Sequence, residues 1–106
     1  MRCRFMQVLV MFDLPVETAT QRRRYRVFRK KLIQEGFVMM QYSMYRKLAL
    51  NHQQANRVEQ FVEKIKPLQG QVWMVSITDK QFKRGKWIVG GEQSIYIQND
   101  ERVIVI

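Results

Sequence analysis

The strongest constraint on this chain is FMQVLVMF, a run of eight residues near its start in which Gln7 is the only polar residue. A run so rich in Val, Leu, Met and Phe, with little alternation, predicts a central strand covered on both faces. Asp13-Leu14-Pro15 follows, and Pro15 ends the strand because it cannot donate a ladder hydrogen bond. The sequence thus predicts a buried strand over Phe5–Phe12 with a single acid at its end.

A basic helix is predicted to follow this strand. Thr18 with Gln21 three residues later is the pattern of a capping box, which marks a helix start. Gly36 is typical of the position just beyond a helix end. Between them Phe28 and Leu32 share one apolar face, and arginines and lysines occupy the opposite side.

Strands and a second helix are predicted for the next segments. Aromatic and β-branched residues predict strands at 37–41, 44–50 and 72–78. Asn51 predicts the start of a helix, which the Pro67–Gly70 segment ends. The resulting order is β-α-β-β-α-β, so we expect an α+β, ferredoxin-like fold with two helices on one face of an antiparallel sheet.

Residues 1–106 are expected to form one domain, because a chain of this length supports a single core. Residues 79–106 are predicted to be a loop and a C-terminal strand extension, with strands at 94–98 and 102–106 and a further short strand within 86–89. The second sheet face would be open and apolar, and a symmetric partner is the simplest cover. We therefore predict a homodimer, in which the last strand joins its own sheet or the edge of the partner's.

Net charge indicates the kind of partner. The chain carries 19 lysines and arginines against 9 acids, and seven of the ten residues at 22–31 are cationic. Such a cluster favours nucleic acid, bound through its phosphates, with a plain solvated surface as the alternative. A membrane surface is disfavoured because the core needs the apolar side of the helix. The single Cys3 and the short apolar runs predict a cytoplasmic protein without zinc or disulfide chemistry.

Asp13 is the one acid with a suggestive position, and two interpretations stay open. An aspartate before Leu-Pro commonly forms an Asx turn with the next backbone amides. Alternatively, a two-fold axis near the strand end would bring two such carboxylates together. Mg²⁺ often takes only one or two protein carboxylates and completes its shell with water and phosphate, and it could activate water against a phosphodiester.

Four stretches, in order along nearly the whole chain, resemble a known family: MFDLPVET, RRRYRVFRKKLIQEGFVMMQYSMYRKL, ITDKQF and ERVIVI. They resemble the small adaptation subunit of CRISPR systems, the Cas-two family, in the form found with type II loci. The resemblance implies a ferredoxin-like homodimer that bridges two integrase dimers and holds the duplex DNA of a new spacer. It also implies a metal-dependent endonuclease (Mg²⁺ or Mn²⁺) that acts on single-stranded RNA or double-stranded DNA.

The resemblance also assigns residues. Asp13 takes the metal-binding and catalytic position, facing its copy across the dimer. The nucleic-acid-binding candidates lie where the family is basic: Arg22, Arg23, Arg24, Arg26, Arg29, Lys30 and Lys31. Weaker candidates are Arg46, Lys47, Lys83, Arg84 and Lys86.

Two other functions fit the same strand order. One is a stand-alone ribonuclease of the toxin type. The other is a non-enzymatic RNA-binding module, which would carry an aromatic strand motif such as K/R-G-F-x-F. The chain has no such string, and in that module the open sheet face would bind RNA and not a second copy. Adaptation is therefore the expected role, with the ribonuclease next.

Overall fold

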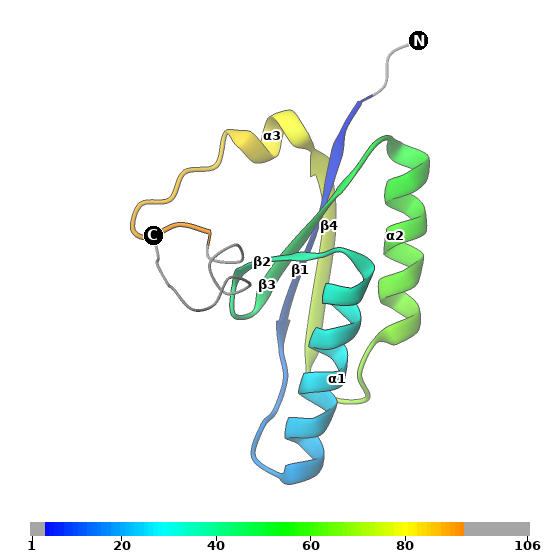
Figure 1. Cartoon of the computed structure of the whole chain (residues 1–106), viewed down its shortest axis with the longest axis vertical. Helices are drawn as coiled ribbons and strands as arrows, with labels where there is room; N and C mark the ends of the chain where they lie inside the picture. The colour runs from blue at the N-terminus through cyan, green and yellow to red at the C-terminus, as the bar shows by residue number, and fades with distance from the viewer. Residues whose placement is uncertain (1–3, 93–106) are drawn as a thin grey trace.

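A computed structural model describes residues 4–92, where four strands form one antiparallel sheet and two long helices cover one of its faces (Figure 1). The elements are β1 (Met6–Asp13), α1 (Ala19–Glu35), β2 (Val38–Gln41), β3 (Met44–Ala49), α2 (His52–Ile65), β4 (Gln71–Thr78) and α3 (Asp79–Lys83). In space the strands lie in the order β2-β3-β1-β4. This is the ferredoxin-like arrangement, so the predicted fold class is confirmed.

β1 is the central strand that the apolar run predicts, displaced by one residue from the expected bounds. Val8 and Val10 are fully buried on the face that carries the helices, where they share one core with Phe28 and Leu32 of α1. Successive side chains alternate between faces, so Gln7 and its odd-numbered neighbours lie on the other face. Gln7 is nevertheless only 4% exposed, so both faces of β1 are covered at this end.

Local capping sets the bounds of α1 as predicted. The Thr18 hydroxyl accepts a hydrogen bond from the backbone N–H of Gln21, and the Gln21 side chain accepts one from the backbone N–H of Thr18. Gly36 ends the helix in the left-handed conformation, with a φ of 107°. Such a reciprocal cap satisfies two backbone donors that the helix itself cannot, so Thr18 and Gln21 together fix the start of α1.

The second helix and the hairpin before it also follow the sequence pattern. The Asn51 side chain accepts a hydrogen bond from the backbone N–H of Gln54, which caps α2. Ala55, Val58 and Val62 recur at helical spacing and are buried against the sheet. β2 and β3 are joined at 42–43, as expected, and a bulge interrupts their register. The two helices thus close one face of the sheet with apolar side chains.

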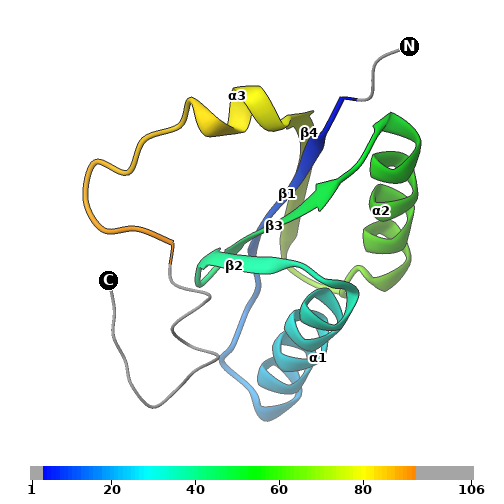
Figure 2. The same ribbon diagram turned by 45° about the horizontal axis from the view of Figure 1, so that its top comes forward.

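The prediction of a loop from residue 79 is wrong at its start, and the second face is less open than expected. Thr78 and Gln81 form another capping box, which begins the short helix α3 at Asp79. Residues 86–89, predicted as a possible strand, have no regular structure. Figure 2 shows α3 and the segment that follows it on the side of the sheet opposite α1 and α2. Leu9 on that face is only 8% exposed, so part of the face is covered by the chain itself.

Some expectations lie outside residues 4–92: Cys3, and the strands predicted at 94–98 and 102–106, with their pairing. The homodimer also stays a prediction. Within the described part of the chain, no helix is long and apolar enough to cross a membrane.

Candidate functional site

Asp13 ends β1 on the face of the sheet that α1 and α2 do not cover. It lies opposite Gln71 of β4, and its side chain is exposed. Phe12, one residue earlier, packs edge-on against Phe28 in the core, so the alternation of the strand turns Asp13 away from the helices. Among residues 4–92 no hydrogen bond or ion pair engages its carboxylate. The Asx turn that the sequence also allowed is therefore not formed.

Gly70, just before β4, fixes the backbone around Asp13. Its φ is 94°, a left-handed conformation that glycine adopts without cost. A Cβ at this position would lie 2.7 Å from the carbonyl oxygen of Asp13 and 2.7 Å from Cδ2 of Leu14. Only glycine therefore permits this approach of two backbones. Sequence reasoning used Gly70 only as part of a helix end, because its contact with Asp13 is far away along the chain.

The Asp13 carboxylate borders an open hollow of about 330 Å³. Met11, Met44 and Trp73 provide its apolar lining, and Trp73 is 57% exposed. An exposed tryptophan beside two methionines is typical of a protein-binding surface. The site thus combines one charged oxygen donor with an apolar surface around it.

The chemistry of the donors limits which metal this chain could hold. Within residues 4–92 no group of three or more His, Cys, Asp or Glu side chains gathers in one place. A single exposed carboxylate fits Mg²⁺ or Mn²⁺, which accept few protein oxygens together with water and phosphate. It does not fit zinc, which prefers three or four nitrogen or sulfur ligands.

Two of the predicted basic residues of α1 already have partners. Arg22 donates to the backbone oxygens of Val16 and Glu17, at 3.2 and 3.1 Å, and so braces the loop between β1 and α1. Arg29 donates through Nε to the Tyr45 hydroxyl at 2.7 Å. Burial raises the pKa of Tyr45, and the neighbouring Arg29 charge opposes that rise. The other α1 candidates are exposed and have no ion-pair partner in the described part of the chain: Arg23, Arg24, Arg26, Lys30 and Lys31.

The weaker basic candidates divide in the same way. Lys47 donates through Nζ to the Glu35 carbonyl oxygen at 2.8 Å, at the end of α1. Lys83 pairs with Asp79 at 3.2 Å. Lys86 and its neighbour Arg84 are exposed and have no ion-pair partner among residues 4–92.

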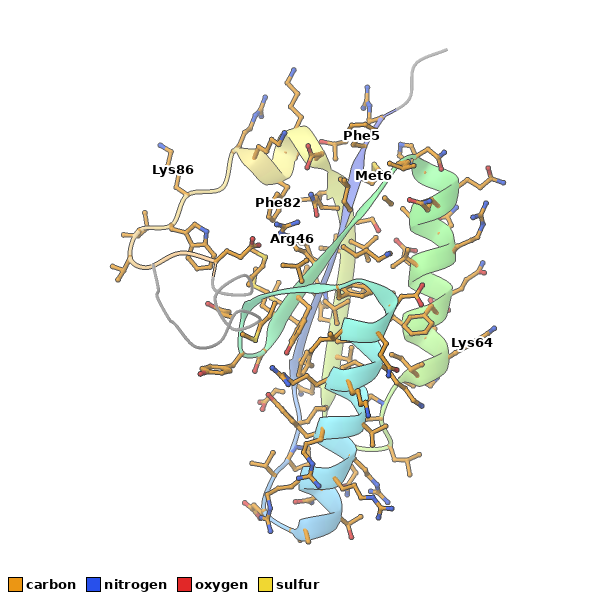
Figure 3. All side chains as sticks on the ribbon, in the orientation of Figure 1. Phe5, Met6, Arg46, Lys64, Phe82 and Lys86 are labelled. Carbon is orange, nitrogen blue, oxygen red and sulfur yellow. The ribbon has the colours of Figure 1, made fainter. Side chains whose placement is uncertain are left out.

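Arg46 is the most constrained of the weaker candidates. Its Nε and Nη2 donate to the two carboxylate oxygens of Glu92, at 2.6 and 2.9 Å. Its guanidinium also lies 5.2 Å from the ring centroid of Phe82, within the range of a cation–π contact. Figure 3 labels both side chains. Arg46 therefore fastens the end of the described chain to the sheet. Sequence analysis missed this pair because 46 residues separate its members.

The structure does not bring Asp13 together with the exposed basic residues of α1. Asp13 lies on one face of the sheet, and α1 covers the other. Both do lie towards the same end of the molecule, since α1 starts near the end of β1 (Figure 1). A polyanion along α1 would therefore pass the Asp13 end of the sheet without lying over Asp13 itself.

Comparison with known proteins identifies the family. Residues 6–85 match the family model described as CRISPR associated protein Cas2, the Cas-two family named above. A "CRISPR-associated endoribonuclease Cas2" of Treponema denticola is 43% identical over 95% of this chain and 100% of its own length. Proteins of the same name from Ligilactobacillus salivarius and Streptococcus mutans are 38% and 35% identical over 95% of this chain, and over 100% and 93% of their own lengths. This chain belongs to the CRISPR-associated Cas2 family.

Proposed function

We propose that this chain acts in CRISPR adaptation as a homodimer that holds duplex spacer DNA and bridges integrase dimers, and that it cleaves phosphodiester bonds at Asp13. The observation that carries the nuclease part is the exposed carboxylate of Asp13 at the end of a buried strand, which has no ion-pair partner among residues 4–92. Its relatives bear the name endoribonuclease, so RNA is the first substrate to test.

The surface around Asp13 supports the proposal of a dimer. Met11, Met44 and the exposed Trp73 form an apolar patch that residues 4–92 leave partly exposed. A second copy placed there would cover the patch and bring a second Asp13 close to the first. Two such carboxylates at 4 Å repel by roughly 1 kcal/mol in water, and a shared Mg²⁺ would relieve that repulsion. A divalent cation there would supply positive charge and lower the pKa of a bound water.

The exposed residues of α1 support the binding part of the proposal. Arg23, Arg26 and Lys30 follow one another at intervals of three and four residues, and so form a line along the outer side of the helix. Guanidinium groups suit phosphate oxygens because they donate paired hydrogen bonds. Such a line would hold a duplex through its backbone, largely without reading its sequence.

The test compares Asp13→Asn with a triple variant, Arg23→Gln/Arg26→Gln/Lys30→Gln, both purified in parallel with the wild type. With Mg²⁺ or Mn²⁺ we expect Asp13→Asn to lose cleavage of labelled RNA while duplex DNA binding stays within about twofold. We expect the triple variant to bind duplex DNA more weakly and to lower the salt slope by up to roughly 2.7, or about 0.9 for each lost phosphate contact. Glu63→Gln, an exposed change on α2, is the control for altered charge.

Each part of the proposal fails separately. Undiminished cleavage by Asp13→Asn would remove Asp13 from the chemistry. Unchanged duplex affinity of the triple variant at low salt would remove α1 from the binding surface. Sedimentation as a monomer at micromolar concentration would rule out the shared site, and failure to bind a CRISPR integrase would rule out the bridging role.

A further inference from the structure

A second hollow lies at the start of β1, at the opposite end of that strand from Asp13. It is open, has a volume of about 540 Å³, and is lined by Arg4, Phe5, Thr78, Asp79, Lys80 and Lys83. This volume is within the range of about 300–1,000 Å³ that small-ligand sites occupy. Eight residues of strand separate Phe5 from Asp13, which is about 26 Å at 3.3 Å per residue. The hollow is therefore distinct from the Asp13 site.

Backbone contacts build this hollow. The N–H of Asp79 donates to the carbonyl oxygen of Phe5 at 2.8 Å, which joins the start of α3 to the residue before β1. The capping box of Thr78 and Gln81 sets the first turn of α3. These contacts place the lysines of α3 beside Phe5, so the pocket is part of the fold rather than a chance gap between loops.

The acid in the hollow is already satisfied by neighbours. Asp79 accepts a hydrogen bond from Nε2 of Gln7 at 2.8 Å and pairs with Lys83 at 3.2 Å. The Gln7 hydrogen bond and the Lys83 contacts hold the pKa of Asp79 below its usual value, against the effect of burial. Arg4 and Lys80 have no ion-pair partner in the described part of the chain. The hollow thus offers two positive charges that form no ion pair with the acids of residues 4–92.

Phe5 gives the hollow a second kind of contact. Its side chain is 50% exposed, so half of it is accessible to a ligand in the hollow. An aromatic ring beside cations is the arrangement that binds single-stranded nucleic acid, because bases stack on the ring and cations contact phosphates. A carboxylate-rich peptide would use the cations but would have no flat ring to place on Phe5.

We propose that this hollow binds an unpaired nucleotide of a single-stranded polynucleotide, with its base stacked on Phe5 and its phosphates held by Arg4 and Lys80. The inference rests on the proposed function and deepens it. One strand that reached both ends of β1 would have an anchoring point about 26 Å from the Asp13 carboxylate. The anchor would favour substrates with unpaired segments over blunt duplexes.

The experiment measures fluorescence anisotropy of a labelled oligouridylate and of a blunt DNA duplex, with EDTA present so that nothing is cleaved. We expect Phe5→Ala to weaken single-strand binding by roughly fivefold to hundredfold, the cost of one lost base stack. Duplex affinity should change less than twofold, and Phe5→Trp should keep single-strand binding. We expect Arg4→Gln/Lys80→Gln to lower the single-strand salt slope by roughly 1.4, or about 0.7 for each lost contact.

Two exposed changes elsewhere serve as matched controls. Lys64→Gln removes a cation from the last turn of α2. Figure 3 shows Lys64 well away from Phe5. Leu68→Ala removes an exposed apolar side chain from the loop before β4. Both should leave single-strand binding unchanged, and circular dichroism should show that every variant folds like the wild type.

The possible results separate this inference from the proposed function. Wild-type single-strand affinity in Phe5→Ala and in the double variant would overturn the inference and leave the proposed function standing. Absence of any nucleic-acid binding by the wild type would remove both. Displacement of the oligouridylate by polyglutamate as readily as by unlabelled RNA would show a peptide-binding surface instead, and would also overturn the inference.

Discussion

The two faces of the sheet are built by different means. On the face of α1 and α2, the side chains of Val8, Val10 and Tyr45 are fully buried, and the helices are held to the sheet mainly by apolar packing. On the other face, the cover is fastened by polar contacts: Gln7 to Asp79, and Arg46 to Glu92. The first face is a conventional hydrophobic core, whereas the second is a surface whose covering segment is held by side-chain hydrogen bonds and an ion pair.

On the second face, burial also changes along β1 from its start to its end. At its start the second face is covered, and Gln7 is 4% exposed. At its end the same face leaves Asp13 and Trp73 accessible. Exposed apolar area is costly to leave in water and gives a partner a place to bind. Among residues 4–92 the helix-covered face is therefore closed along β1, and the other face stays accessible at the Asp13 end.

The largest expected effect tests whether stability resides on the helix-covered face. Phe28→Ala should lower the free energy of unfolding by about 3–5 kcal/mol, because it leaves a cavity beside Phe12. Trp73→Ala should cost less than about 1 kcal/mol in dilute solution, because Trp73 is largely exposed. Urea denaturation measures both.

Protein concentration sharpens that test. If copies associate through the second face, the cost of Trp73→Ala should grow as concentration rises, since binding stabilises the folded chain by mass action. A cost as large as that of Phe28→Ala at every concentration would contradict the division between the faces.

The same division separates what the sequence predicts from what it does not. The bounds of α1 were predicted because their causes are local: Thr18 and Gln21 form one cap and Gly36 the other. The covering segment of the second face was not predicted, because the side-chain contacts that hold it join residues far apart in the sequence, such as Arg46 and Glu92. Propensity and periodicity carry local information, and neither identifies which distant side chains will meet.

The candidate site shows the same limit. Asp13 could be selected from the sequence because an acid after an apolar run is unusual, and the resemblance gave it a role. Gly70, whose backbone lies beside that of Asp13, could not be selected in this way, because a glycine after a helix is already explained as the residue that ends the helix. The contact of Gly70 with the Asp13 carbonyl appears only when β4 is placed beside β1.

Substitution of Gly70 tests this close approach of two backbones. Gly70→Ala should lower the free energy of unfolding by about 1–2 kcal/mol for the left-handed backbone alone. The added Cβ would also displace the backbone of Asp13 and Leu14, so cleavage should fall more than stability accounts for. Gly91→Ala is the matched control, because nothing lies within 4 Å of a Cβ there. Equal stability of the two variants would show that the end of β1 adjusts freely.

The smallest expected effect is the pH dependence of the polar contacts on the second face. It is tested at the hydrogen bond between Gln7 and Asp79. The Gln7 hydrogen bond lowers the pKa of Asp79, so the folded chain favours the charged carboxylate. This contribution is complete above the unfolded value of about 3.9 and is lost as the pH falls through the lower folded value. Asp79→Asn should therefore be less stable than the wild type near neutral pH, by up to about 1 kcal/mol.

That difference should shrink as the pH falls below about 4, because the wild type then loses its charge as well. Glu63→Gln, an exposed acid on α2, is the matched control and should show little pH-dependent difference. Urea titrations at several pH values measure all three proteins. A gap between Asp79→Asn and the wild type that widens in acid would mean that the charged form is not the one the fold favours. The attachment of α3 to the second face would then depend on the packing of its side chains and not on the charge of Asp79.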